Sequence, residues 1–295
     1  METPERLSFQ RLSLSSPSTP QSSSASRLWR PAAQRNLRNQ WSKLVACRQR
    51  WAAAASRGRS QATSLVNAYL SQIYMPNMKL GALSDFPDIR EKASRKLFRQ
   101  QELHRSKLVL TYRDLVSVVL EMVDISRSMR CYSKGATSSP IAQFSNSSDA
   151  GDDAGDGGGV AIFRYWSIPE FELLAEELIQ MFKSELDVKR KLMIELLSIS
   201  SQKDQVSEPV SWSCELYLGE FEDLRRCNLD LTRIYELSLS NCQSSSHKTA
   251  KISGESASKV LEVYLTIWLA EVKIDVDRLE EILNLIGSEM QVNLK

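Results

Sequence analysis

Apolar and small residues recur every three or four positions over most of the chain, which is the spacing of one face of an α-helix. The first seam predicts a helix over 31–75, with Arg48 at one seam position and Gly58 as a weak point that could interrupt it. A second seam predicts a helix over 87–132. At about 1.5 Å per residue each helix would be on the order of 65 Å long, so the pattern favours long helices packed along one another. The two seams comprise Leu37, Trp41, Leu44, Trp51, Ala55, Gly58, Ala62, Leu65 and Tyr69, and then Leu97, His104, Leu108, Leu115, Val119, Met122 and Met129.

Three further helices are predicted in the second half of the chain. The first follows SIPE at Ser167–Glu170, which has the form of a capping box, and continues to about residue 199. The second covers about 211–240, with Asn228 at an inward position where a polar residue can fix register. The third covers about 258–289, and for its alternating segment VKIDVD at 272–277 we favour helix over a short strand.

The fold class that follows is all-α, an elongated bundle or paired long helical hairpins with coiled-coil-like packing. Five segments are expected along the chain, because periodicity is lost in two of them. They are a disordered Ser-rich tail (1–26), a basic helical arm (27–84), a long helix (85–132), a flexible Gly-, Asp- and Ser-rich linker (133–160) and a C-terminal helical region (161–295).

Charge is distributed unevenly, although the net charge is only +2. The stretch from Arg6 to Ser84 holds 12 Lys or Arg and no Asp or Glu, whereas residues 85–295 have eight more acidic than basic residues. Four interpretations of the basic arm stay open: nucleic-acid binding, docking to an acidic protein surface (in another chain or in this one), an organellar transit peptide, and a solvated helix face.

A row of cations on the first helix contains the candidate binding residues. Lys43, Arg50 and Arg57 are seven residues apart, and Arg38 flanks their row, so we expect them to contact nucleic acid or an acidic partner. Trp41 and Trp51 have two interpretations, one as core residues and one as an interface for unpaired bases or for a partner helix.

Catalytic chemistry has little support in the sequence. There are two histidines and five cysteines, without CxxC pairs or zinc-ligand spacing, and neither GxSxG nor HExxH occurs. The stretch GDDAGDGGG lacks the GK[ST] of a phosphate loop and the ligand spacing of an EF-hand. We therefore expect no enzyme activity, cofactor, metal or small-molecule substrate.

Cysteine use favours reduced thiols, and hence the nucleus or the cytoplasm. No apolar run approaches the roughly 20 residues of a bilayer crossing, so we expect no membrane association. Three hydroxyls that precede proline, Ser16, Thr19 and Ser139, are candidate phosphorylation sites, since phosphate there would add negative charge near the basic arm.

The stretch SLVNAYLSQIYMPNMKLGALSD (64–85), followed by RKLFRQQELHRSKL (95–108), resembles the plant multipolar spindle family. The similarity covers at most 60 residues, includes no catalytic motif and transfers no functional residue. It implies a nuclear, non-enzymatic helical factor that acts through protein partners near DNA, in meiotic recombination and spindle organisation.

Two hypotheses about function result, together with a third about location. The first is a nuclear scaffold or adaptor that contacts chromatin or an acidic protein partner through the basic helix, in meiotic or mitotic chromosome and spindle processes. The second is a cytoplasmic coiled-coil subunit of a cytoskeletal or tethering complex, in which the Trp41–Trp51 seam pairs with another chain. Import into an organelle is the third.

Overall fold

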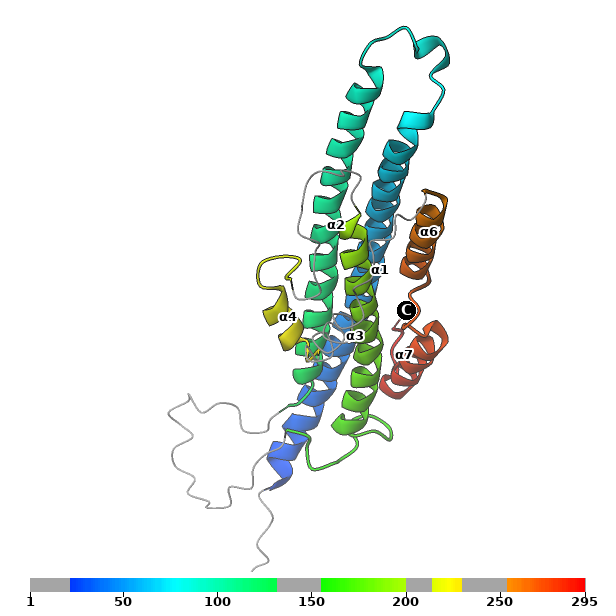
Figure 1. Cartoon of the computed structure of the whole chain (residues 1–295). Coiled ribbons are helices and arrows are strands. Elements are labelled where there is room, and N and C mark those ends of the chain that lie inside the picture. Colours follow the sequence, from blue (N-terminus) through cyan, green and yellow to red (C-terminus); the bar gives the residue numbers. More distant parts are fainter. Residues whose placement is uncertain (1–21, 132–154, 200–213, 230–253, 295) are drawn as a thin grey trace, which may run out of the picture.

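The computed structural model describes residues 22–131, 155–199, 214–229 and 254–294, and every regular element in these ranges is a helix. The prediction of an all-α, elongated bundle is confirmed (Figure 1). The α-helices are α1 (Ser22–Tyr74), α2 (Ile89–Arg127), α3 (Ile168–Ser198), α4 (Glu220–Arg226), α6 (Gly254–Ala270) and α7 (Val276–Met290), and two 3-10 turns, Met75–Asn77 and Gly81–Leu83, join α1 to α2.

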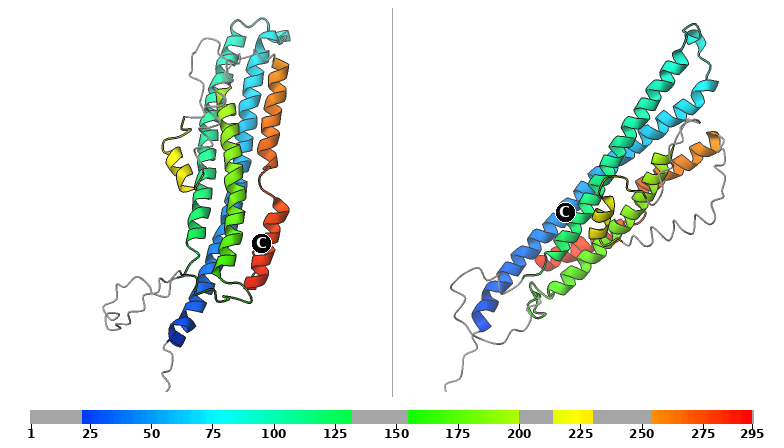
Figure 2. Two further views of the ribbon diagram at one scale, coloured as in Figure 1. Left: turned by 60° about the horizontal axis from the view of Figure 1, so that its bottom comes forward. Right: turned by 60° about the vertical axis from the view of Figure 1, so that its left-hand side comes forward.

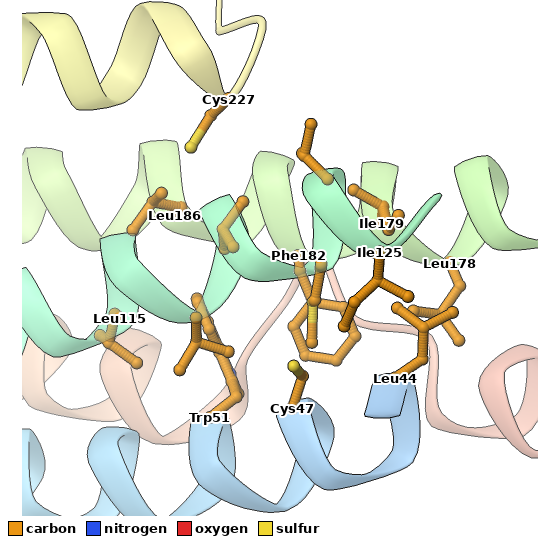
Figure 3. Close-up of a cluster of buried hydrophobic side chains, with 14 of the residues drawn as sticks. Leu44, Cys47, Trp51, Leu115, Ile125, Leu178, Ile179, Phe182, Leu186 and Cys227 are labelled. Atoms are coloured by element: carbon orange, nitrogen blue, oxygen red, sulfur yellow. The ribbon is translucent and has the colours of Figure 1, made fainter. Parts of the chain in front are cut away.

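The bundle is built on an antiparallel hairpin of α1 and α2. Helix α3 lies along this hairpin, α6 and α7 follow one another beside it, and α4 packs against α2, as the views in Figure 1 and Figure 2 show. The predicted seam of α1 faces the other helices, and its tryptophans are inside the core. In Figure 3 the side chain of Trp51 lies among residues of α2 and α3, and its ring meets Phe182 edge-on, with the ring centroids 5.3 Å apart.

Gly58 does not interrupt α1, contrary to the expectation of a weak point. The helix continues through it because the indole of Trp268, from α6, packs directly on the glycine. A Cβ atom at this position would lie 2.4 Å from Cζ2 of Trp268, and the indole Nε1–H donates to the carbonyl oxygen of Ala55 at 3.0 Å. Because Gly58 has no side chain, the Trp268 ring can pack directly on the backbone of α1, and this contact docks α6.

The capping box predicted at the start of α3 is present. The backbone N–H of Ser167 donates to the carboxylate of Glu170 at 2.9 Å, and the Ser167 side chain bonds to the same carboxylate, which lowers the pKa of Glu170. The hydrogen bonds of the backbone N–H and of the hydroxyl of Ser167 are therefore made within four residues, which explains why this helix start could be predicted from sequence.

Two helix predictions in the second half need correction. The helix expected over 258–289 is two helices, because Glu271 adopts a left-handed backbone (φ 46°) after α6 ends. Residues 272–275 of the alternating segment are not helical, and its last two residues begin α7. Asn228, expected to face inward, is exposed at φ 57° just after α4 ends at Arg226. Residues 230–240 of the other predicted helix lie outside the described ranges.

A buried ion pair on α3 holds the bend between α6 and α7. Glu185 and Lys189 are both fully buried, with 3.0 Å between the carboxylate and the ammonium nitrogen. The Lys189 ammonium donates to the backbone carbonyl oxygen of Trp268, in the last turn of α6, while the Glu185 carboxylate accepts the backbone N–H of Lys273 at 2.9 Å. One ion pair therefore satisfies backbone groups on both sides of the bend.

Glu271 completes this polar cluster. Its carboxylate accepts the indole N–H of Trp51 at 2.9 Å, which ties the bend to α1. Burial is the largest cause of the raised pKa of Glu271, partly offset by the charge of Lys189.

We expect Gly58→Ala to lower the free energy of unfolding by about 1–3 kcal/mol, because the added methyl group collides with the Trp268 ring. In an open helix the same change would stabilise by up to about 1 kcal/mol, so the sign of the effect tests the packing. Urea unfolding measures it, with the exposed position Ser56→Ala as control. A stabilised Gly58→Ala variant would show that Trp268 does not dock here.

We expect Glu271→Gln to become more stable relative to the unmodified chain as pH rises from 4.5, the ordinary pKa of this group. Because the folded state holds the proton more tightly than the unfolded state, the glutamate loses stability as pH rises through its raised pKa, whereas glutamine does not titrate. Unfolding free energies of both chains between pH 4.5 and neutrality test this. A constant difference, or a relative loss for the variant, contradicts it.

Candidate partner-binding surface

The cation row predicted on α1 has a structural role within the hairpin. The guanidinium of Arg50 pairs with Glu121 of α2, and that of Arg57 pairs with Asp114 at 2.9 Å. Both partners are seven residues apart on their own helix and run in the opposite order, as an antiparallel register requires. Arg50 and Arg57 therefore contact an acidic surface of this same chain, which is one of the alternatives that the sequence left open for the basic arm.

The other two predicted cations differ from one another. Arg38 donates to the carbonyl oxygen of Met290 at 3.2 Å, and its guanidinium lies 5.0 Å from the centre of the Phe163 ring, so it joins α1 to the end of α7. Lys43 is exposed and makes no ion pair within the described ranges. Within the described ranges, Lys43 is the one of the four predicted binding residues whose charged group contacts neither a carboxylate, a carbonyl oxygen nor an aromatic ring.

Trp41 and Trp51 are also corrected as interface residues. Both side chains are buried by the chain's own helices and belong to the core of the bundle, in which Figure 3 shows Trp51. A partner chain could reach them only by displacing helices of the bundle. The candidate phosphorylation sites Ser16, Thr19 and Ser139 lie outside the described residues.

The end of the α1–α2 hairpin extends beyond the shared core. From residue 69 to residue 100 no side chain is buried, and Figure 1 shows the two helices continuing past α3 and α6. Contacts within the hairpin hold this end together: Arg90 donates to the carbonyl oxygens of Met75 (2.5 Å), Pro76 (2.9 Å) and Met78 (2.6 Å), and Gln101 donates to Gln72 at 2.5 Å.

One face of α2 carries cations along this extension. We name it the α2 basic stripe, and its residues follow each other at spacings of three and four, as one helix face requires. Its cations are exposed and lack a carboxylate within ion-pair distance in the described ranges, and its two leucines are 51% and 61% exposed. The stripe consists of Lys92, Lys96, Arg99, Leu103, Lys107 and Leu110.

The same face changes sign beyond Leu110. Asp114 and Glu121 continue it toward the end of α2, and there the arginines of α1 neutralise them. Folding explains those charges but not the ones on the stripe, since Lys92 lies in the first helical turn, where the helix dipole disfavours a cation. The stripe thus places positive charge on the projecting end, with Lys92, Lys96 and Arg99, and exposed apolar surface next to it, with Leu103 and Leu110.

Catalytic features are weak in the described residues. Nδ1 of His104 lies 2.9 Å from the amide oxygen of Gln61, and burial lowers the pKa of this imidazole, as expected for a satisfied structural histidine. Burial raises the pKa of the Cys227 thiol to about 12, which keeps it protonated and unreactive at neutral pH. In the same ranges no group of three or more Cys, His, Asp or Glu could hold a metal ion.

None of the helices in the described ranges has both the length and the apolar character that crossing a membrane requires. No family model, no curated protein and no solved structure matches the chain. The geometry of the bundle and its surfaces is therefore the basis for assigning a function.

The stripe could have been found in the sequence. Leu97, His104 and Leu108 were predicted to lie on the inner side of this helix, and the positions between them, such as Arg99 and Leu103, then face outward. The sequence pattern does not show that α1 neutralises Asp114 and Glu121 and leaves the cations of the stripe without a carboxylate in the described ranges.

We expect Arg50→Glu and Glu121→Arg to destabilise the chain singly, and the double exchange to recover most of the loss. An exposed pair of this kind contributes roughly 0.2–1 kcal/mol, and each single exchange sets two like charges against each other. A double-mutant cycle by urea unfolding measures the coupling, with Lys43→Glu as control. If the two single changes in unfolding free energy simply add in the double variant, the pair does not contribute to the register of the hairpin.

Proposed function

We propose that this chain is a non-enzymatic nuclear scaffold or adaptor whose projecting hairpin contacts chromatin or an acidic protein partner through the α2 basic stripe. The observation that carries the proposal is the combination of exposed cations and exposed leucines on one face of α2, which runs from the end of the hairpin to the level of the shared core and has no role in packing. This contact surface lies in the long-helix segment (85–132), so the proposal places binding on α2 instead of on the basic arm (27–84) that the sequence favoured.

The interleaved leucines favour a protein surface over bare nucleic acid. Phosphates are satisfied by cations alone, whereas Leu103 and Leu110 lose exposed apolar area only against another apolar surface. An acidic, amphipathic protein surface satisfies both kinds of residue. Proteins of chromosome and spindle assemblies meet near DNA, and the resemblance to the multipolar spindle family supports that setting.

The alternative of a cytoplasmic coiled-coil subunit loses its specific support. It required the Trp41–Trp51 seam to be open to another chain, and that seam is covered by the chain's own helices. We therefore propose the scaffold alone.

We expect Lys96→Gln/Arg99→Gln to release the full-length chain from the chromatin-bound nuclear fraction of dividing cells at lower salt than the unmodified chain. The reason is that two exposed cations of the docking surface are removed while the buried core is unchanged. Arg35→Gln/Arg59→Gln is the matched control, since it removes two exposed cations of α1 that belong neither to the stripe nor to the cation row predicted to bind. Salt extraction of nuclei followed by immunoblotting measures the release.

Two results would overturn the proposal: equal retention of all three chains, or absence of the unmodified chain from nuclei. Fluorescence anisotropy with double-stranded DNA then separates the two kinds of partner. Direct DNA binding through the stripe gives a slope of log affinity against log salt that falls by roughly 0.9 for each cation removed. A nuclear chain without such binding uses a protein partner.

A further inference from the structure

A second exposed surface of this chain has the opposite charge. Along α7 the outward positions are acidic near the start of the helix and apolar one turn later, around a shallow depression. Leu285 is 39% exposed there, and Val276 is exposed at the beginning of the helix. We name this the α7 acidic face, formed by Asp277, Glu280, Glu281, Asn284, Leu285 and Ser288.

Intramolecular contacts leave this face a negative excess. Glu281 pairs with Arg278 at 2.8 Å, and Glu280 is 3.9 Å from Arg48, a distance at the limit of an ion pair. Arg278 also pairs with Glu177 of α3 at 2.6 Å, so its single charge is shared between two carboxylates. Asp277 makes no ion pair in the described ranges, which leaves the carboxylates of the face able to accept further cations.

The spacing of charge and leucine on the α7 acidic face matches that of the α2 basic stripe. Glu281 precedes Leu285 by four residues, and Arg99 precedes Leu103 by four. If the two helices are laid parallel with these leucines in contact, Arg99 lies opposite Glu281, and Lys96 lies opposite Arg278, next to Asp277. The charge of Arg278 is already neutralised by Glu177 and Glu281, so this register brings together the two leucines and one pair of opposite charges without leaving an uncompensated cation against Lys96.

The two surfaces cannot meet within one molecule. Helix α7 is joined to α1 beside Arg48, whereas the stripe lies beside Gln72, which bonds to Gln101. Along α1 these positions are separated by roughly 35 Å at about 1.5 Å per residue. The stripe is on the projecting end of the hairpin and α7 is toward the opposite end of the bundle (Figure 1, Figure 2).

We infer that the α2 basic stripe of one copy docks on the α7 acidic face of a second copy. The contact joins two different surfaces, so a pair of copies still has one free stripe and one free acidic face, and assembly continues head to tail instead of closing as a dimer. This inference rests on the proposed function in using the stripe as the docking surface, and it names the acidic protein partner as the chain itself.

Complementary charge reversal of the purified full-length chain tests the inference. Lys96→Glu/Arg99→Glu blocks the stripe, and Glu280→Lys/Glu281→Lys blocks the acidic face, each by placing like charges in contact. Each variant alone should be monomeric in sedimentation velocity, at concentrations at which the unmodified chain forms larger, salt-sensitive species. We expect the association constant to fall at least about tenfold in each. Arg35→Glu/Arg59→Glu, with the same change of charge at exposed positions of α1, should assemble like the unmodified chain.

Mixing the two variants gives the decisive result. Neither variant can pair with another copy of itself. In a mixture, the reversed stripe of one variant is complementary to the reversed acidic face of the other, and their unmodified surfaces are complementary as well, so association should return. A mixture that remains monomeric, or an unmodified chain that is monomeric at every concentration and salt, overturns the inference. Neither result bears on nuclear retention through the stripe, which the salt-extraction experiment tests. The proposed function and the proposed self-association can therefore be refuted independently. Circular dichroism of each variant confirms that the helices are intact.

Discussion

The antiparallel register of α1 against α2 is the constraint on which the rest of the structure depends. It places Arg50 opposite Glu121 and Arg57 opposite Asp114, and the same alignment turns the tryptophan seam of α1 toward α3 and α6. A shift of one residue would rotate the seam by about 100° and would expose indole rings to water. The buried seam therefore fixes the alignment and supplies most of the stabilisation, and the exposed ion pairs at its edge add a smaller contribution to the same register.

The other helices are joined to this hairpin by a small number of buried polar contacts. Lys189 and Glu185 hold the bend between α6 and α7, and Arg190 binds Glu220 at 2.8 Å, which fixes α4. Tyr112 of α2 donates to the same glutamate at 2.8 Å. Removal of one member of such a buried pair typically costs about 3–5 kcal/mol, because an uncompensated charge remains inside. These contacts select one arrangement among helices whose apolar faces alone would tolerate several.

The length of the hairpin links the fold to the proposed function. Helix α3 is shorter than α1, so the hairpin extends past the shared core and its end is stabilised only by contacts between the two helices and the turn that joins them. Residues on that end are free of the packing constraints that fix Trp51 or Phe182. A surface of cations and leucines at such a position is suited to contact with another molecule, and the acidic, partly apolar face of α7 has the complementary chemistry.

Much of the fold was predictable because its signals are local. Helical periodicity located α1, α2 and α3, and the capping box located the start of α3, since its hydrogen bonds join residues three apart. The break after Ala270 was not predictable in this way, because Glu271 is held by Trp51, which is distant in sequence.

For the candidate binding surface, too, some features follow from local sequence and others from tertiary structure. The sequence by itself determined that the chain is helical, that its first part is basic and where the apolar seams lie. Only the tertiary structure decided which cations are neutralised: Arg50 and Arg57 meet carboxylates of α2, whereas Lys96 and Arg99 project where the described residues offer none. Periodicity reports which face of a helix is apolar, but the partner of a charged side chain depends on the register between helices far apart in the chain.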